Sequence, residues 1–305
     1  MSLRWGVTGH HISVCICTFK RTELLRRLLD HLESQRTHGL FTYSVVVADN
    51  DVAQSAKQVV AVFSSTTRRM PVTYCVEPQQ NIALTRNRAL EEAKGDLIAF
   101  IDDDEFPADE WLGNLFKALK TYGVDGVLGP VKPHFESDPP AWVTRGRFFE
   151  RPSHTTGYRM PWYESRTGNT LFQRSILTNV DPPFRPQFAT AGEDMDFFRR
   201  AIELGYSFVW CDEAVVYEAV PLLRCSRSYL LRRALLRGSN FPKHPTDRLK
   251  SAAKSLVAVP CYTVALPIFA IFGQHIFLKY LIKLLDHASR LLAYLGLRLV
   301  TERQA

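Results

Sequence analysis

The chain lacks the cysteine patterns that bind zinc or build disulfide frameworks. Its six cysteines include no CxxC pair, and no histidine spacing beside them suits zinc. Cys15 and Cys17 alternate within an apolar stretch, where we expect small buried hydrophobic residues. The sequence also lacks internal repeats, low-complexity tracts and an apolar run near Met1. We therefore expect no secretory signal and reduced thiols in a cytosolic compartment.

Acidic residues are scarce in the last part of the chain. Residues 221–305 contain 14 Lys and Arg but only three Asp and Glu, a net charge of +11, whereas the preceding residues carry a net charge of −4. With 305 residues, the chain is long enough for one large core and an appendage. A basic tail on an acidic body favours a polyanionic partner, which is either nucleic acid or an anionic membrane surface.

Residues 255–278 contain no Asp, Glu, Lys or Arg. The stretch is long enough to span a bilayer, although Pro260 and Pro267 interrupt it. A single span would place the basic C-terminus outside, against the positive-inside tendency. Charged residues recur at three- and four-residue spacing from Lys279 to Arg290, which predicts an amphipathic helix with a basic face suited to a membrane interface. We favour re-entrant or interfacial helices, and the alternative is two helices packed on the body.

Strand-like and helix-like segments alternate through the first half of the chain. Near-continuous apolar strands separated by helices indicate a parallel sheet covered on both faces, so the predicted fold class is α/β. Ligands bind such sheets at the carboxyl ends of the strands, where Thr18, Asp49 and Asp102 fall. Residues 131–167 show no clear periodicity and many prolines and aromatic residues, which is typical of a lid or binding loop. The expected strands are 11–17, 43–48, 72–76, 97–101, 168–172, 208–210 and 214–217, and the expected helices are 22–34 with Thr22 as its cap, 85–94, 193–204 and 228–237, followed by a polar linker over 240–254.

The apolar run 97–101 delivers Asp102, Asp103, Asp104 and Glu105 to its end, and this is the most informative stretch of the sequence. Neighbouring carboxylates repel each other and raise each other's pKa. We expect a cation to neutralise them, and hard oxygen ligands select Mg²⁺, Mn²⁺ or Ca²⁺ rather than zinc. A solvated acidic turn is the alternative interpretation.

A second acidic cluster follows Gly192. The glycine frees the backbone, and Glu193, Asp194 and Asp196 then open a helix whose dipole stabilises negative charge. The two phenylalanines after Asp196 face the core, so the acidic side chains point elsewhere. Simple capping of the helix N-terminus is the alternative.

The order of these segments resembles that of one family, the family-2 glycosyltransferases with the GT-A nucleotide-sugar fold. The resemblance covers residues 11 to about 220 and implies a Rossmann-like, mostly parallel sheet flanked by helices. It implies a catalytic domain over 1–220, and the basic charge and apolar run of the tail predict a helical, membrane-associated appendage over 221–305. Within the family, residues 128–130 and the Arg-rich helix after Pro221 look most like succinoglycan-type exopolysaccharide glucosyltransferases. The motifs that carry the resemblance are residues 17–21, 49–51, 81–89, 102–105, 168–169 and 192–200.

The resemblance implies roles in binding a nucleotide sugar. Asp49 would accept a hydrogen bond from the base, and because carboxylates only accept, it would favour an imide N–H such as that of uracil in a UDP-sugar. Asp102, Asp103 and Asp104 occupy the DxD position, where Mn²⁺ or Mg²⁺ binds the diphosphate in the family. Strand alternation puts Asp102 and Asp104 on one side, makes Asp104 the first metal ligand and turns Asp103 towards the ribose or the sugar. The other residues implied at the nucleotide sugar are Thr18, Arg21, Asp51 and Arg86.

The resemblance also implies catalytic roles. Asp194 would act as general base, removing a proton from the acceptor hydroxyl as it attacks the anomeric carbon, so that one displacement inverts the configuration. Glu193 would orient the acceptor or the donor sugar. Arg200 would approach the leaving diphosphate, or would instead pair with Asp196 four residues earlier. A metal on the diphosphate would stabilise the charge that develops on the leaving group.

One motif departs from the family. Many relatives place a histidine after the last strand as a further metal ligand, but Tyr217 stands there, followed by Glu218. Either Glu218 is a ligand or the metal has fewer protein ligands, since Mg²⁺ and Mn²⁺ readily keep waters. Sugars pack their C–H faces on aromatic rings, and for the aromatic residues the alternative is simple packing of the loop. The expected acceptor residues are Trp142, Trp162, Tyr163 and Asn169.

Together these features predict transfer from a UDP-sugar to a glycan or polyprenyl-diphosphate-linked acceptor, which is a lipid-linked or surface polysaccharide. The expected place is the cytoplasmic face of the plasma (inner) membrane, against anionic lipid and with no nucleic-acid partner. A sugar-phosphate nucleotidyltransferase is an alternative, but residues 18–21 lack the glycines of its loop. A nucleic-acid-binding protein using residues 224–237 leaves the apolar tail unexplained. A non-catalytic membrane scaffold is the last alternative, and the intact acidic residues argue against it.

Overall fold

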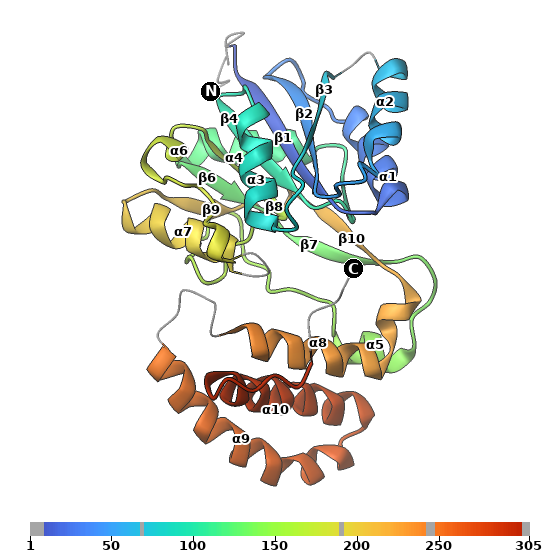
Figure 1. The fold of residues 1–305 in the computed structure, drawn as a ribbon, viewed down its shortest axis with the longest axis vertical. Helices are drawn as coiled ribbons and strands as arrows, with labels where there is room; N and C mark the ends of the chain where they lie inside the picture. The colour runs from blue at the N-terminus through green and yellow to red at the C-terminus, as the bar shows by residue number, and fades with distance from the viewer. Residues whose placement is uncertain (1–8, 68–69, 189–191, 242–247, 301–305) are drawn as a thin grey trace. The chain divides into compact units, whose positions relative to one another are not determined.

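The computed structural model describes residues 9–67, 70–188, 192–241 and 248–300, which fold into two compact units (Figure 1). Unit 1 consists of the residues up to 132 together with 151–218, and unit 2 of 133–150 together with 219 onward. Residues 133–150 thus go with the C-terminal part of the chain. The assignment of a catalytic domain to 1–220 and a membrane-associated region to 221–305 stays a prediction.

Strands and helices alternate through unit 1, and helices dominate unit 2. The strands are β1 (His11–Thr18), β2 (Thr42–Asp49), β3 (Val72–Val76), β4 (Leu97–Ile101), β5 (Glu105–Pro107), β6 (Gly126–Leu128), β7 (Val131–Phe135), β8 (Asn169–Gln173), β9 (Phe208–Trp210) and β10 (Val216–Val220). The helices are α1 (Thr22–Glu33), α2 (Lys57–Thr66), α3 (Ile82–Glu92), α4 (Trp111–Tyr122), α5 (Ala141–Gly146), α6 (Ile176–Asn179), α7 (Glu193–Glu203), α8 (Arg227–Asn240), α9 (Arg248–Ile271) and α10 (Gln274–Tyr294), with short 3₁₀ turns η1 (Pro186–Phe188) and η2 (Leu222–Cys225).

The main sheet of unit 1 has seven strands in the order β3-β2-β1-β4-β8-β6-β9. Its strands run parallel except β8, which pairs antiparallel with both β4 and β6. A smaller sheet has the order β5-β10-β7. The predicted α/β class with a mostly parallel sheet is therefore confirmed.

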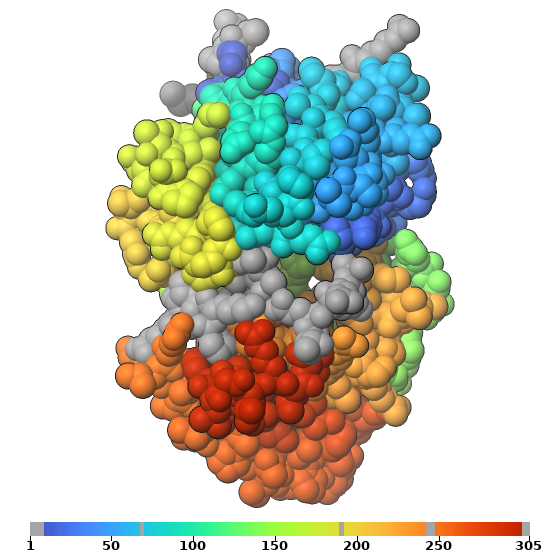
Figure 2. All heavy atoms as spheres, viewed as in Figure 1, coloured from blue at the N-terminus to red at the C-terminus, as the bar shows by residue number. Residues whose placement is uncertain are grey.

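Helices cover both faces of the main sheet (Figure 1). Side chains alternate along each strand, so Val14 of β1 packs with α1, α2 and α4, whereas Cys15 packs with α3 and α7. Figure 2 shows turquoise α3 directly beside the yellow segment that contains α6 and α7, and Asn87 of α3 exchanges hydrogen bonds with the backbone of Phe184 in that segment. Helices thus bury both faces of the sheet, and the polar groups lie at the carboxyl ends of its strands.

Several predicted boundaries are wrong for local reasons. Thr22 does not cap α1, because the N-cap residue is Arg21 and makes no side-chain cap. The helix expected from residue 85 begins at Ile82, since the Asn81 side chain accepts from two backbone N–H groups there. Residues 131–167 contain β7 and α5 rather than loop alone. In the expected linker, 248–254 are helical, whereas 242–247 lie outside the described residues, as does the stretch near Met1.

In unit 2, α10 lies between α8 and α9 (Figure 1). The predicted amphipathic helix is present, but part of its polar face is buried. Asp286 accepts from Arg237 of α8 at 2.7 Å and from Arg290 at 2.8 Å, and the Ser289 hydroxyl donates to a carbonyl of α8. These groups therefore pack against protein. The sequence did not predict this, because periodicity shows which face of a helix is polar but not what covers that face.

Within the described ranges, α9 is the one helix long and apolar enough to cross a membrane. Pro260 and Pro267 lie inside it, and most of its apolar side chains are exposed. Along its length α9 packs on α10 through Phe269 and Tyr280, whose rings stack at 3.6 Å, and through Ser255 and His287 at 3.0 Å. The two helices therefore form one hairpin.

Candidate active site

The four carboxylates after β4 lie in a tight turn and at the start of β5. Asp103 is 5% exposed and accepts from the Thr18 hydroxyl at 2.9 Å and from Arg21 at 2.8 Å. Arg21 also lies 3.2 Å from Asp104. Burial raises the pKa of Asp103 to about 6, although Arg21 favours its ionised form. Thr18, Arg21 and the acidic turn thus meet, as the predicted nucleotide pocket requires.

The expected alternation of Asp102 and Asp104 is wrong. β4 ends at Ile101, and the next three residues form a turn, so strand geometry does not apply to them. Asp103 and Asp104 share the Arg21 guanidinium, whereas Asp102 lies 3.8 Å from Arg86. Which of these carboxylates binds a metal is therefore not decided by strand alternation.

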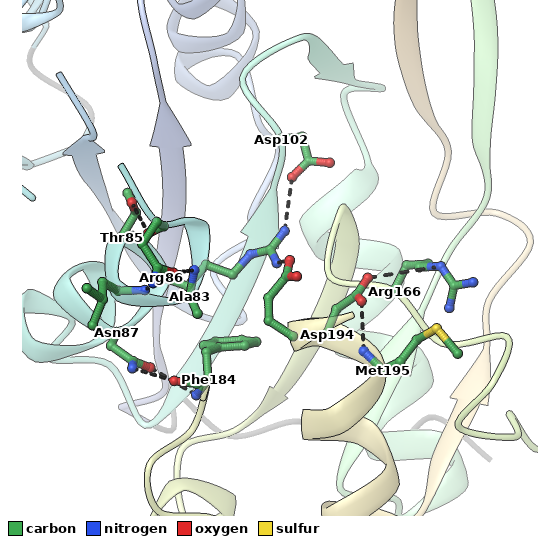
Figure 3. Close-up of polar contacts among 12 residues, drawn as sticks. Ala83, Thr85, Arg86, Asn87, Asp102, Arg166, Phe184, Asp194 and Met195 are labelled. Carbon is green, nitrogen blue, oxygen red and sulfur yellow. Dashed lines mark hydrogen bonds and ion pairs between the residues drawn. The ribbon is translucent and has the colours of Figure 1, made fainter. Parts of the chain in front are cut away.

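Arg86 links the acidic turn to the start of α7 (Figure 3). Its guanidinium extends from α3 towards Asp102 and donates a hydrogen bond to Glu193. Arg86 and Glu193 are both buried, and the charge sits over the ring of Phe184. Burial raises the pKa of Glu193 to about 7 and the charge of Asp194 adds to the rise, while Arg86 opposes it. The pair therefore joins α3, whose Arg86 was predicted to bind the nucleotide sugar, to α7, whose Glu193 was predicted to orient the acceptor or the donor sugar.

Asp194 lies in the first turn of α7, next to the Arg86–Glu193 pair. Gly192 allows the turn before it, because its φ of 95° falls in the left-handed region. One Asp194 oxygen accepts from the Met195 N–H at 2.7 Å, and the other lies 4.0 Å from Arg166 Nε (Figure 3). The side chain is 16% exposed, so part of the carboxylate is accessible to solvent. Sequence reasoning missed Arg166, because nothing in the sequence around it links it to Asp194.

Sequence reasoning gave Arg151 no role, and it placed Glu105 in the acidic run without a role of its own. Glu105 is 2% exposed and accepts from the Asp102 N–H at 3.1 Å. Glu218 lies opposite Glu105 across β5 and β10, and Arg151 donates to Glu218 at 2.5 Å. Tyr217, at the position of the family's histidine, stacks on Phe106. Glu218 therefore lies beside Glu105 with Arg151 as its cation, and its role as a metal ligand stays a prediction.

Asp49 and Asp51 follow β2, but their carboxylates are turned inward. Asp49 is fully buried and accepts from the N–H groups of Asp51 and Ala56 and from the Tyr74 hydroxyl, each at 2.9–3.0 Å. Asp51 is 5% exposed and accepts from a nearby backbone N–H. A base would reach Asp49 only by replacing one of these donors, and its nucleotide role stays a prediction.

The remaining predicted residues take internal roles. Arg200 donates to Asp196 at 2.9 Å, which is the alternative role that the sequence allowed. The Asn169 amide is 3% exposed and bonds to Trp111 and to two backbone carbonyls, so it braces β8. Trp142 belongs to unit 2, whereas Trp162 and Tyr163 belong to unit 1, where their rings meet edge to face. Acceptor binding by these residues stays a prediction.

The carboxylates suit a hard divalent cation, with one restriction. Asp102, Asp104 and Glu218 supply only oxygen donors. Within the described residues, however, no group of three or more His, Cys, Asp or Glu side chains lies close enough to hold a metal. Mg²⁺-type ions are commonly bound by one or two carboxylates together with substrate phosphates. The site therefore fits a cation that a bound diphosphate helps to hold.

A mostly parallel sheet with an acidic turn at the end of its central strand, beside a helix that begins with carboxylates, defines a GT-A-type enzyme acting on nucleotide sugars. Residues 13–179 match the family described as Glycosyl transferase family 2, and residues 97–299 match Glycosyl transferase family group 2. The chain belongs to glycosyl transferase family 2.

Two curated relatives agree with this assignment. The chain is 33% identical over 234 residues to the succinoglycan biosynthesis protein ExoM of Rhizobium meliloti (strain 1021), covering 75% of this chain and 73% of that protein. It is 26% identical over 209 residues to the glycosyltransferase AglE of Haloferax volcanii, covering 67% of this chain and 65% of that protein.

Solved structures share the fold at low sequence identity. The mannosyltransferase PcManGT from Pyrobaculum calidifontis, in complex with GDP-Man and Mn²⁺, superposes with a TM-score of 0.62 at 20% identity, covering 95% of this chain and 87% of that one. S. aureus TarS in complex with UDP superposes with a TM-score of 0.55 at 16% identity, covering 96% and 94%. The predicted GT-A fold and glycosyltransferase class are confirmed.

Proposed function

We propose that the chain is an inverting glycosyltransferase that moves a sugar from a UDP-sugar to a lipid-linked or surface-polysaccharide acceptor. The observation that carries the proposal is the Arg86 bridge. It joins Asp102 at the predicted donor site to Glu193, the neighbour of Asp194. A donor held at the acidic turn would therefore have a partly exposed carboxylate beside it. That is the arrangement an in-line displacement needs.

In this mechanism Asp194 is the general base. The acceptor hydroxyl oxygen forms a bond to the anomeric carbon while the bond from that carbon to the diphosphate oxygen breaks, and the hydroxyl proton passes to Asp194. Arg166 steadies the negative charge of Asp194 from 4.0 Å before the transfer. The Arg86–Glu193 pair fixes the first turn of α7, and so positions Asp194 towards the donor.

The donor would be held at the acidic turn with Mn²⁺ or Mg²⁺. The residues that would hold the cation are Asp104 and Asp102, with Glu218 as the further carboxylate. Such an ion supplies neutralisation of the negative charge on the departing diphosphate. Thr18 and Arg21 keep Asp103 and Asp104 in place, and Arg21 remains close enough to attract phosphate. The Mn²⁺ named in the mannosyltransferase complex supports this choice of ion.

The acceptor and the place of action follow from the relatives and from unit 2. ExoM is named for succinoglycan biosynthesis, which supports an exopolysaccharide or its lipid-linked precursor. We propose action at the cytoplasmic face of the membrane, with α9 and α10 in the interface. α10 carries Lys279, Lys283, Asp286 and Arg290, and a spanning α9 would draw these charges into the hydrocarbon at about 2.5–3.5 kcal/mol for each Lys, Arg or Asp at the centre.

Family membership argues against the alternatives drawn from the sequence. A nucleotidyltransferase or a nucleic-acid-binding protein would not be expected to match the glycosyltransferase family over 13–179. A non-catalytic scaffold would keep its cellular function in Asp194→Asn and would transfer no sugar even as the wild type.

The test is thermal stabilisation of the detergent-purified chain by UDP, GDP, dTDP and CMP, each with and without Mn²⁺ or Mg²⁺. A nucleotide at about 100 times its Kd adds ~2.7 kcal/mol, so we expect a shift of several degrees with UDP and metal. The shift should shrink in Asp104→Asn and persist in Asp30→Asn, an exposed aspartate of α1. If no nucleotide stabilises the folded protein, the proposal fails.

A further inference from the structure

Three carboxylates crowd together beside the predicted metal site. Glu105 of β5 and Glu218 of β10 lie directly opposite each other, and like charges in such pairs destabilise a sheet. Asp102 Oδ2 and Glu105 Oε1 both lie 3.0 Å from the point where a side chain at residue 168 would begin, and Gly168 leaves that point open. A cation is needed to hold these groups together without bound ligand.

Arg151 is that cation. Its Nη2 donates to Glu218 Oε2 at 2.5 Å. Burial acts against its charge, yet Glu105, Glu218 and Asp102 together raise the pKa of Arg151 above its ordinary value. In return, the Arg151 charge counters the rise that burial and Asp102 impose on the pKa of Glu105. The Arg151 guanidinium thus pairs with Glu218, and its charge also acts on Glu105 and Asp102.

The segment that carries Arg151 is fixed to unit 1 by nearby bonds. The Ser153 hydroxyl donates to Asp212 at 2.7 Å, and the Thr156 hydroxyl donates to Glu213 at 2.6 Å. Asp212 and Glu213 lie in the turn that leads into β10, the strand of Glu218. The fold therefore keeps the Arg151 backbone near Glu218, and only the Arg151 side chain has to move for the ion pair to open.

Arg151 does not satisfy the whole cluster. Glu105 Oε1 is buried and has no hydrogen-bond partner among the described residues, although it faces the open point over Gly168. A buried carboxylate oxygen without a donor is costly, and a metal ion or its bound water would satisfy it. Arg151 thus pairs with Glu218, while Glu105 Oε1 keeps an acceptor position that no described group fills.

We infer that Arg151 is a built-in counter-ion that competes with the divalent cation for Glu218. In the ligand-free enzyme the guanidinium balances Asp102, Glu105 and Glu218 and keeps the affinity for free metal low. When the donor brings its diphosphate and a metal ion, Arg151 leaves Glu218 to them. The inference rests on the metal-assisted function proposed above, and it makes Arg151 a positioning residue that couples metal binding to donor binding.

The test is Mn²⁺ binding to the full chain without nucleotide, measured from the electron paramagnetic resonance signal of free Mn²⁺. Arg151→Met should raise the affinity for Mn²⁺ alone by about tenfold or more, because it removes a unit charge next to the ligand oxygens. Arg151→Lys keeps the charge and should bind like the wild type. Arg147→Met, which removes an exposed arginine paired with Glu150, is the matched control and should change nothing.

The outcomes separate this inference from the proposed function. If Arg151→Met binds Mn²⁺ no better than the wild type, while both bind it with UDP present, the counter-ion role is overturned and metal use stands. If neither binds Mn²⁺ even with UDP, the metal-assisted function fails and this inference with it. Should Arg151→Met not fold, Arg151→Gln gives the same test, since it keeps a donor for Glu218 without the charge.

Discussion

Arg86 of α3 donates a hydrogen bond to Glu193 of α7, across 107 residues of chain. Both side chains are buried, and Arg86 also lies 3.8 Å from Asp102. One guanidinium thus ties the helix that follows β3 to the acidic turn and to the helix that begins with the proposed base. The stability of unit 1 and the placement of Asp194 depend on the same contact.

Arg86→Met should therefore destabilise the protein strongly. It leaves the Glu193 carboxylate buried without its cation, a loss of about 3–5 kcal/mol for broken buried pairs. Arg88→Met, two residues along α3, removes only exposed pairs with Glu91 and Glu92 and should cost no more than about 1 kcal/mol. Thermal unfolding compares the two. Equal losses would contradict the bridging role, and Arg86→Met/Glu193→Gln should recover part of the stability.

The same pair predicts a pH dependence. The folded-state pKa of Glu193 is about 7, above the value of about 4.3 expected for an unfolded chain, so the folded state binds the proton more tightly. Glu193 therefore costs stability as pH rises from about 5 to about 8. The melting temperature of Glu193→Gln minus that of the wild type should increase as pH rises over this range. Glu203→Gln, at an exposed position of the same helix, should show no such trend.

Asp194→Asn should abolish transfer and preserve donor binding. Asparagine keeps the shape but cannot accept the hydroxyl proton, so kcat should fall by about 10²–10⁴. The nucleotide-induced thermal shift should stay at the wild-type value, because the proposed donor contacts lie at the acidic turn. The measurement is transfer from a UDP-sugar, with Glu203→Gln as the control on α7. Wild-type kcat in Asp194→Asn would remove it as the base, whereas no transfer by the folded wild type would favour a scaffold.

The two neighbouring aspartates of the turn should behave differently. Asp103→Ala leaves Thr18 and Arg21 without their acceptor and should cost about 1–3 kcal/mol of stability. Asp104→Ala should cost less stability, but should remove the extra thermal shift that UDP gains from Mn²⁺. Melting curves with UDP, with Mn²⁺ and with both compare the two variants. If Asp103→Ala loses the metal effect at unchanged stability, the roles assigned to the pair are reversed.

Exposed apolar residues of α9 should control membrane binding. Val264 and Ile268 are 76% and 54% exposed, and burying each side chain in a membrane interface contributes about 1.5–3 kcal/mol. Val264→Asp and Ile268→Asp should each weaken binding to anionic vesicles by about tenfold or more, as vesicle sedimentation measures. Val52→Asp, at an exposed apolar position of unit 1, is the control. Unchanged binding in all three would place the membrane contact elsewhere.

Six of the seven strands of the main sheet could be predicted from local apolar runs, whereas the three-residue β6 was missed. The apolar runs of β1 to β4 are bounded by turn residues, and periodicity alone located them. The position of the acidic turn was predicted because it follows the apolar run of β4, but the directions of its carboxylates were not. The prediction assumed that side chains continue to alternate between the two faces of the strand after Ile101. The backbone instead turns there, and β5 then pairs with β10.

Contacts between distant segments escaped prediction. Arg151 and Glu218 are 67 residues apart, and Arg166 meets Asp194 only because β8 and α7 pack in the same unit. Neither arginine stands in a distinctive local pattern. Asp286 and Arg290 show the converse case, since a polar helix face suggested solvent or lipid headgroups and the fold covers it with α8. Periodicity carries no information on which element lies opposite.

The reversed direction of β8 has a consequence for how such a protein changes over time. β6 ends at Leu128 and β8 starts at Asn169, and both ends lie at the edge where β4 delivers its carboxylates, since Leu128 pairs with Thr170 and Ile101 with Asn169. The intervening chain leaves and rejoins the sheet at the same rim. Insertions or deletions after β7 in this excursion leave the register of every strand of the main sheet unchanged. A change of length in this excursion would therefore leave the acidic turn after β4 in place.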